Sequence, residues 1–291
     1  MVYQEQTASL SERPLQPALK RHSWWRATVL VLLVAWLYWS ILFHLGKQWS
    51  SDANFSHAFF VPACSLFILW RDRVRLAQQP RVPSSWGLLI VALALFVLVV
   101  GVLGAELFLS RISLLLLIAG LVISLHGWQL FRAVLFPWAF LILMIPIPAL
   151  VFSQITLPLQ MLASKVAAIL LPLAGVPVLR EGNVIHLSSM RLEVAEACSG
   201  IRSLLSLTTL AIIYGYLVET RIWVRVLLAV ASIPIAVAAN SLRIVGTGLL
   251  VQYWDPDKAQ GFFHTFSGWL VFVVSLAMLL LLHRLLRISR G

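Results

Sequence analysis

The residues best suited to covalent chemistry in this sequence lie in the segment Glu196–Arg202, which reads EACSGIR. Cys198 stands where a polar, strand-like stretch gives way to an apolar, helix-like one. A thiol at the start of a helix meets the positive end of the helix dipole, which favours the nucleophilic thiolate. Cysteine also packs well as a small hydrophobe, so this segment alone leaves both roles open for Cys198. Cys64, among apolar neighbours, fits the packing role.

A cation for such a nucleophile is available in the segment Ala239–Ile244, which interrupts a long apolar run. An ionisable residue inside such a run is costly and usually faces protein or water. Arg243 could therefore stabilise a thiolate or the oxyanion of a tetrahedral intermediate. Asn240, three residues earlier, is expected on the same helical face as a further donor. Arg202 follows Cys198 by four residues and is the rival cation.

Histidines supply the acid–base chemistry that a thiol mechanism needs near neutral pH. His264 lies just before the last apolar run. His57, His44 and His186 are expected on the same side of the membrane, so position alone does not choose among them. The histidines lack metal-ligand spacing and the two cysteines are far apart in sequence, so we expect no metal and no cofactor.

The elements that position these residues belong to a membrane protein. Hydrophobic residues make up 60% of the 291 residues and charged residues 11%, against about 25% charged in soluble domains. A spanning helix needs roughly 20 apolar residues. We expect an all-α polytopic protein with about eight transmembrane helices, at about 27–45, 57–70, 87–104, 107–126, 133–151, 200–219, 226–250 and 266–286. The run at 154–174 carries polar residues and prolines, which favours an interfacial or re-entrant helix.

A small β-element is expected before Cys198, over about 175–197. Three short apolar runs, 176–179, 184–187 and 191–194, are separated by turn residues, which predicts a small antiparallel sheet. Sheet edges cannot lie in lipid. The β-element should therefore cover the helix bundle at its periplasmic face.

The charges predict the orientation. Fourteen of the basic residues fall in segments expected to be cytoplasmic and eight in outer segments or adjoining span ends, as the positive-inside rule requires. We expect a cytoplasmic segment 1–26, a membrane domain 27–287 and both termini in the cytoplasm. The net charge of +11 is dispersed over short loops, which argues against binding to nucleic acid.

In their order and spacing, four motifs resemble the exosortases, multi-pass bacterial membrane cysteine transpeptidases. The motifs are Phe55–Pro62 followed by Trp70 and Arg71, then Glu196–Arg202, Asn240–Ile244 and His264–Gly268. The resemblance covers most of the chain. Its one departure is Ala58, where the family usually has glycine.

The resemblance implies that Cys198 is the nucleophile, Arg243 the supporting cation and His264 the acid–base residue. Glu196, Arg202, Asn240 and His57 are the expected supporting residues. The implied substrates are exported proteins with a C-terminal PEP-CTERM signal: a Pro-Glu-Pro motif, a transmembrane helix and a basic tail. The enzyme would pass the cleaved protein to an acceptor nucleophile or to water. It would act in the inner membrane, in contact with lipid, with its site facing the periplasm, and family members often accompany exopolysaccharide export.

Two other functions fit the composition. A transporter also carries intramembrane arginine and asparagine residues, but the polar segments here gather at one face rather than at the midplane, and no inverted repeat is visible. A non-catalytic scaffold of a polysaccharide export complex would tolerate the loss of the Cys198 thiol. Mutation of Cys198 would distinguish these two functions from that of a cysteine transpeptidase.

Overall fold

The computed structural model describes residues 24–187, 191–193, 200–253 and 262–288, and the chain divides into two compact units, Met1–Phe43 and His44–Gly291. Predicted residues Glu196 and Cys198 lie outside the described residues. The elements are α1 (Trp24–Leu37), α2 (Trp39–Ser51), η1 (Ala53–Phe59), α3 (Phe60–Arg71), α4 (Arg73–Ala77), α5 (Trp86–Leu103), α6 (Leu107–His126), α7 (Trp128–Ala133), α8 (Leu135–Phe140), η2 (Leu141–Met144), α9 (Ala149–Leu173), β1 (Leu179–Glu181), β2 (Val184–His186), β3 (Arg191–Glu193), α10 (Ile201–Val218), α11 (Ile222–Tyr253) and α13 (Phe262–Ile288).

The helices confirm the predicted fold class. Seven described helices are long and apolar enough to cross a membrane, or eight when the bent pair α1–α2 counts as one span. The seven are 53–71, 86–103, 107–126, 149–173, 201–218, 222–253 and 266–288. Six of these seven overlap predicted spans closely. In the first unit, α1 and the first residues of α2 form the apolar helical segment predicted over 27–45.

The expected continuous helix over 133–151 is wrong in detail. The chain forms the short helices α7, α8 and η2 and then leaves helical geometry after Met144. Pro146 and Pro148 explain the break, because proline lacks an N–H donor and disfavours helical geometry in the residue before it. The Met144 carbonyl instead accepts a 2.9 Å hydrogen bond from Trp49 Nε1. An extended segment, Ile145–Pro148, therefore sits between two helical regions.

Helix α9 has the length and hydropathy of a membrane span. Near its start, the Phe152 ring lies 5.9 Å from the Phe55 ring of η1. After its end, the Ala174 carbonyl accepts a 3.0 Å hydrogen bond from the Tyr253 hydroxyl at the end of α11. The interfacial or re-entrant placement expected for 154–174 stays a prediction.

The predicted sheet is present, with antiparallel strands in the order β1-β2-β3. Pairing of Glu181 with Val184 leaves Gly182 and Asn183 as a two-residue turn, and Gly182 has the φ of +64° that such turns favour. The first strand begins at Leu179 rather than at residue 176. The turn docks on α9, where Ser164 Oγ donates to the Gly182 carbonyl at 2.9 Å and accepts from Arg180 Nε at 2.9 Å.

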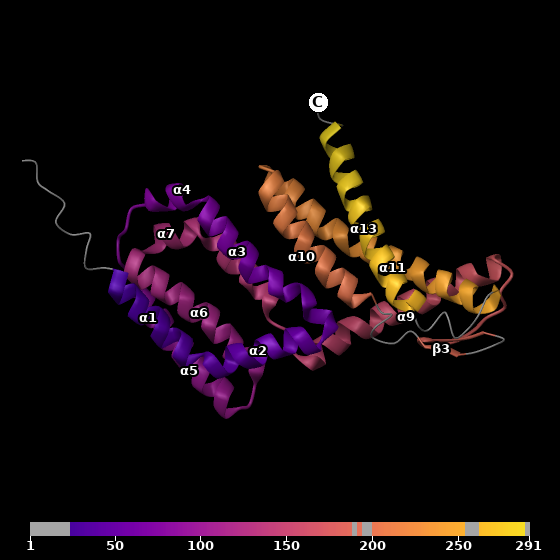
Figure 1. Ribbon diagram of the computed structural model, residues 1–291, viewed down its shortest axis with the longest axis horizontal. Helices are drawn as coiled ribbons and strands as arrows, with labels where there is room; N and C mark the ends of the chain where they lie inside the picture. Colours follow the sequence, from indigo (N-terminus) through magenta and orange to yellow (C-terminus); the bar gives the residue numbers. More distant parts are fainter. Residues whose placement is uncertain (1–23, 188–190, 194–199, 254–261, 289–291) are drawn as a thin grey trace, which may run out of the picture. The chain divides into compact units, whose positions relative to one another are not determined.

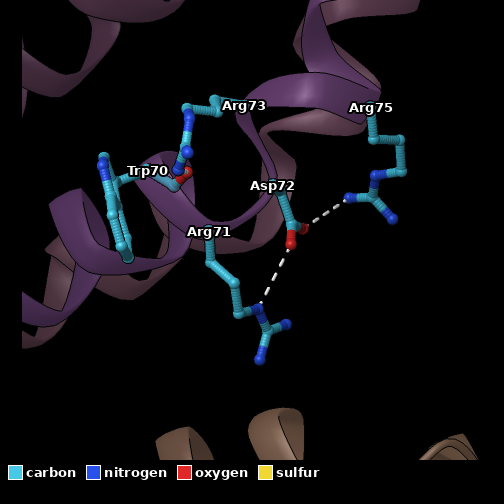
Figure 2. A network of polar contacts seen from close by, with 5 residues as sticks. All are labelled: Trp70, Arg71, Asp72, Arg73 and Arg75. Atoms are coloured by element: carbon cyan, nitrogen blue, oxygen red, sulfur yellow. Dashed lines mark hydrogen bonds and ion pairs between the residues drawn. The ribbon is translucent and has the colours of Figure 1, made fainter.

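The junction of α3 and α4 is a compact polar cluster (Figure 2). Arg71 and Arg75 both converge on Asp72, at 3.2 and 2.9 Å. Arg73 turns to Trp70 instead, donating to its carbonyl at 3.0 Å with its guanidinium 4.7 Å from the ring centroid. An aromatic residue followed by clustered arginines is typical of a helix end at the membrane surface.

Helices α10, α11 and α13 pack against one another in the second unit (Figure 1). Helix α10 also packs against η1. Leu207, Leu228 and Leu279 belong to the shared buried core. Near the ends of α10 and α13, His283 bridges Tyr214 Oη and Glu219 Oε1, each at 2.7 Å. These contacts join α10 and α13 near their last residues, whereas the predicted motifs lie near the first residues of both helices.

Candidate active site

A cavity of about 860 Å³ lies in the second unit, between η1, α3, α8, α10, α11 and α13. We call it the first cavity. Its polar lining includes Ser56, His57, Arg202, Ser206 and Arg243. Its apolar lining includes Phe60, Val61, Phe140, Ile213 and Phe272. Residues from four separate motifs of the sequence thus border one space.

The polar lining residues gather where α3 and α10 begin. His57 precedes the first residue of α3, and Arg202 is the second residue of α10. The apolar lining residues Cys64 and Ile213 come later in the same two helices. From Arg202 to Ile213 the cavity follows α10 for about 17 Å, at 1.5 Å per residue. The cavity therefore has a cationic end and an apolar end.

Arg243 is held in place by α13. Its Nε donates a 3.2 Å hydrogen bond to Ser267 Oγ. Its guanidinium also lies against Gly268, where an added Cβ would stand 3.9 Å from Cζ and Nη2. The side chain is half-buried and lines the first cavity. Ser267 of the predicted His264–Gly268 motif thus orients the cation and Gly268 lies beside it, which sequence spacing did not reveal.

Gly200 connects the candidate nucleophile segment to α10. It caps the helix with a φ of +75°, a left-handed conformation that favours glycine. A Cβ at this position would also stand 2.7 Å from Asn240 Cγ. Asn240 is only 1% exposed and packs behind Gly200 rather than lining the first cavity. Its position therefore supports the entry into α10.

Three hydroxyl residues of α10 add a polar stripe that sequence analysis missed. Ser203, Ser206 and Thr209 line the first cavity at intervals of three residues. Residues three or four apart share one face of a helix. The signal was present in the sequence as hydroxyls in an otherwise apolar helix, which in membranes favours protein or a polar ligand over lipid.

The predicted site residues divide into three groups. His57, Arg202 and Arg243 are brought together around the first cavity, and Asn240 adjoins it through Gly200. Cys198, Glu196 and the His264 side chain lie outside what the structure describes, although α13 includes His264 in its first turn. His186 lines neither this cavity nor its neighbours and instead contacts Glu181 at 3.3 Å.

Cys64 lines the first cavity as well, half-buried beside Val61. Its packing role was expected, but its access to the cavity was not. Among the described residues, no group of three or more His, Cys, Asp or Glu side chains could hold a metal ion. The described part of the site thus offers cationic and acid–base groups and one thiol, that of Cys64.

Comparison with known families gives one match. The family model described as transmembrane exosortase (Exosortase_EpsH) matches residues 49–281. This range includes every residue that lines the first cavity. No curated protein and no solved structure matches the chain.

Proposed function

Because this chain belongs to the transmembrane exosortase family of membrane protein-sorting transpeptidases, we propose that it cleaves PEP-CTERM sorting signals with Cys198 as the nucleophile. The observation that carries the proposal is the cationic end of the first cavity. There Arg202, Arg243 and His57 line the same cavity as Gly200, which follows Cys198 by two residues. The cleaved protein is then transferred to an acceptor or to water.

Chain connectivity supports Cys198 as the nucleophile. Consecutive Cα atoms are 3.8 Å apart, so residues two apart have Cα atoms within about 8 Å. The Cys198 Cα is therefore within that distance of the Gly200 Cα at the edge of the cavity. The two arginines that line the cavity with Gly200 and the N-terminus of α10 would favour a thiolate over a thiol at Cys198. Glu196, two residues before Cys198, is proposed as a supporting residue.

The proposed reaction begins with cleavage and ends with transfer of the acyl group to the acceptor or to water. In the cleavage step, the Cys198 thiolate attacks the scissile carbonyl, Arg243 stabilises the oxyanion, and the amine leaves to give a thioester. His264 is proposed to donate a proton to that amine. His264 precedes Ser267 by three positions in α13, a spacing that predicts the same helical face as the residue that orients Arg243.

The shape of the first cavity suits such a signal. Its apolar length along α10 offers contacts to the signal's transmembrane helix. The Pro-Glu-Pro motif would then lie at the cationic end, where its carboxylate pairs with Arg202, an exposed side chain that lines the cavity. Reversing the charge of that glutamate should slow cleavage, and unchanged cleavage would exclude this pairing.

The proposed orientation follows the charge distribution. The chain would lie in the bacterial inner membrane with segment 1–26 and both termini in the cytoplasm, domain 27–287 in the membrane, and the site open to the periplasm. The arginine cluster around Asp72 would then mark the cytoplasmic end of α3.

The test uses a reporter protein that ends in a PEP-CTERM signal, expressed with the wild-type enzyme, Cys198→Ala or Cys64→Ala. Equal membrane insertion is verified for all three enzymes. Cys198→Ala should abolish both the size shift of the reporter and any hydroxylamine-sensitive enzyme–reporter adduct. Because Cys64 also borders the first cavity, loss that follows Cys64 rather than Cys198 would assign the thiol chemistry to Cys64.

Full processing by Cys198→Ala would reject the mechanism. It would leave the transporter and scaffold functions, which need no thiol. Loss of processing in Arg243→Gln, with insertion intact, would support the proposed role of the cation.

A further inference from the structure

A second cavity, of about 360 Å³, adjoins the first. His57 and Thr209 line both cavities and so form the wall between them. Nine of the twelve residues that line the second cavity are apolar, among them Phe55, Phe108, Ile147, Val151 and Leu205. The polar chemistry at its boundary is therefore concentrated where it meets the first cavity.

The wall of the second cavity includes the extended segment between η2 and α9. Ile145, Ile147 and Pro148 of this segment all line it. In membrane proteins, non-helical backbone at this depth is tolerated where it is enclosed by protein or borders a cavity. The same type of interruption is used at ligand sites in membrane transporters. The break after Met144 thus creates space instead of continuing a packed helix.

Within the part of the chain that the structure describes, His57 is the only ionisable residue that lines the second cavity. Its Nδ1 is buried and makes no hydrogen bond of good geometry with a described residue. The backbone of Asn54 and of Leu143 offers hydrogen bonds to the ring when it is protonated. Buried polar atoms are normally paired, so the Nδ1 atom, which lacks a well-made bond in the cavity wall, calls for a functional explanation. We therefore assign Nε2, the other ring nitrogen, to contact with a bound molecule.

We propose that the second cavity binds the acyl acceptor, an amine or alcohol on an apolar stem, and that His57 is the base that activates it. This inference rests on the proposed Cys198 thioester. The stem occupies the apolar second cavity, and the nucleophilic atom reaches the first cavity past His57. Cleavage and transfer therefore use different histidines, His264 for the leaving amine and His57 for the acceptor.

The transfer step balances without any further reactant. The acceptor nitrogen or oxygen attacks the thioester carbonyl and forms a new bond to its carbon. The carbon–sulfur bond breaks, and its electron pair leaves with Cys198 as a thiolate. The proton lost by the acceptor passes to His57 Nε2. Arg243 stabilises the oxyanion in this step as in the first.

Straight-chain primary amines from methylamine to hexylamine test the binding site. Each is supplied at one concentration to membranes that contain the enzyme and a reporter ending in a PEP-CTERM signal. Mass spectrometry measures the fraction of reporter recovered as alkylamide. Each methylene that enters the cavity should raise capture about fourfold, until the cavity is filled.

Two neighbouring residues of α9 provide matched variants. Val151 lines the second cavity, whereas Leu150 is 79% exposed and does not. Val151→Phe should flatten the dependence on chain length, and Leu150→Phe should keep it. Amine partitioning into the membrane would affect both variants equally. An equal slope in both variants, or no slope in the wild-type enzyme, would overturn the acceptor site and would mean that the cavity holds only lipid or no ligand.

His57→Gln tests the base, with His186→Gln as the matched control at a histidine outside both cavities. His57→Gln should accumulate the hydroxylamine-sensitive adduct at least tenfold over wild type while alkylamide formation falls. His186→Gln should not. Wild-type transfer by His57→Gln, or loss of the adduct in a correctly inserted His57→Gln protein, would overturn the assignment.

The two proposals fail in different ways. Cleavage without Cys198 removes the thioester and with it the proposed function. Cleavage that needs Cys198 but shows no effect of chain length and no accumulation in His57→Gln removes only the acceptor site.

Discussion

Gly200→Ala is the substitution whose cost follows most directly from the structure. The φ of +75° at this position costs an L-residue about 1–2 kcal/mol. The added Cβ would also stand 2.7, 2.8 and 3.0 Å from Asn240 Cγ, Cβ and Nδ2. Overpacking of a buried site costs about 1–3 kcal/mol. The two effects together predict a loss of about 2–5 kcal/mol.

Two other glycines separate these effects. Gly182 has a φ of +64° with nothing within 4 Å of an added Cβ, so Gly182→Ala should cost only the backbone part, about 1–2 kcal/mol. Gly246 lies inside α11 and also has open space around it, so Gly246→Ala should stabilise by about 1 kcal/mol. The glycine series therefore predicts the order Gly246→Ala, wild type, Gly182→Ala, Gly200→Ala, from most to least stable.

The assay is thermal unfolding of each variant in lipid nanodiscs, where about 2 °C of melting temperature corresponds to each kcal/mol. Gly200→Ala should melt about 4–10 °C below wild type. Adding Asn240→Ala removes two of the three close contacts, so the double variant should lose less than the sum of the single variants. If Gly200→Ala and Gly182→Ala melt at the same temperature, the contact between Gly200 and Asn240 is absent and the reasoning fails.

Three further substitutions test other contacts. Ser267→Ala removes the acceptor that orients Arg243, so the initial rate of reporter cleavage should fall about tenfold with insertion unchanged; an unaltered rate would mean that Arg243 is held by other contacts. Tyr214→Phe removes the hydroxyl bound to His283 and should lower the free energy of unfolding by about 1 kcal/mol in the same assay. Unchanged stability would argue against this partly buried hydrogen bond. Asp72→Asn breaks two ion pairs of exposed arginines and should lower the free energy of unfolding by less than about 1 kcal/mol. A larger loss would mean that these ion pairs contribute more to stability than exposed pairs usually do.

Sequence patterns were sufficient for six of the seven long helices, because hydropathy and length determine these spans. The predicted run 107–126 coincides with α6 in both bounds. The turn at Gly182 was also predictable, since glycine beside asparagine between two apolar runs favours a tight reversal. In both cases the signal is local in the chain.

The missed features depend on contacts between distant segments. Hydropathy predicted one helix over 133–151, which the prolines interrupt. The interrupted segment borders the second cavity together with Phe108 and Leu205, which come from distant parts of the chain. The spacing of Arg202 and Arg243 left two rival cations, whereas the structure has both at one cavity. The support of Arg243 by Ser267, 24 residues away, has no periodic signature in the sequence.

The length of α11 relates the site to the thickness of the bilayer. Its 32 residues extend about 48 Å, against about 30 Å of hydrocarbon. Asn240 and Arg243 stand 18 and 21 residues after the first residue of α11, or about 27 and 32 Å along it. The cation of the proposed site thus lies near one hydrocarbon thickness from the helix start. In the proposed orientation, with α11 entering the hydrocarbon at its first residue, a thicker bilayer would draw this guanidinium into hydrocarbon and a thinner one would move it among headgroups. Lipid chain length should then act on the proposed cation.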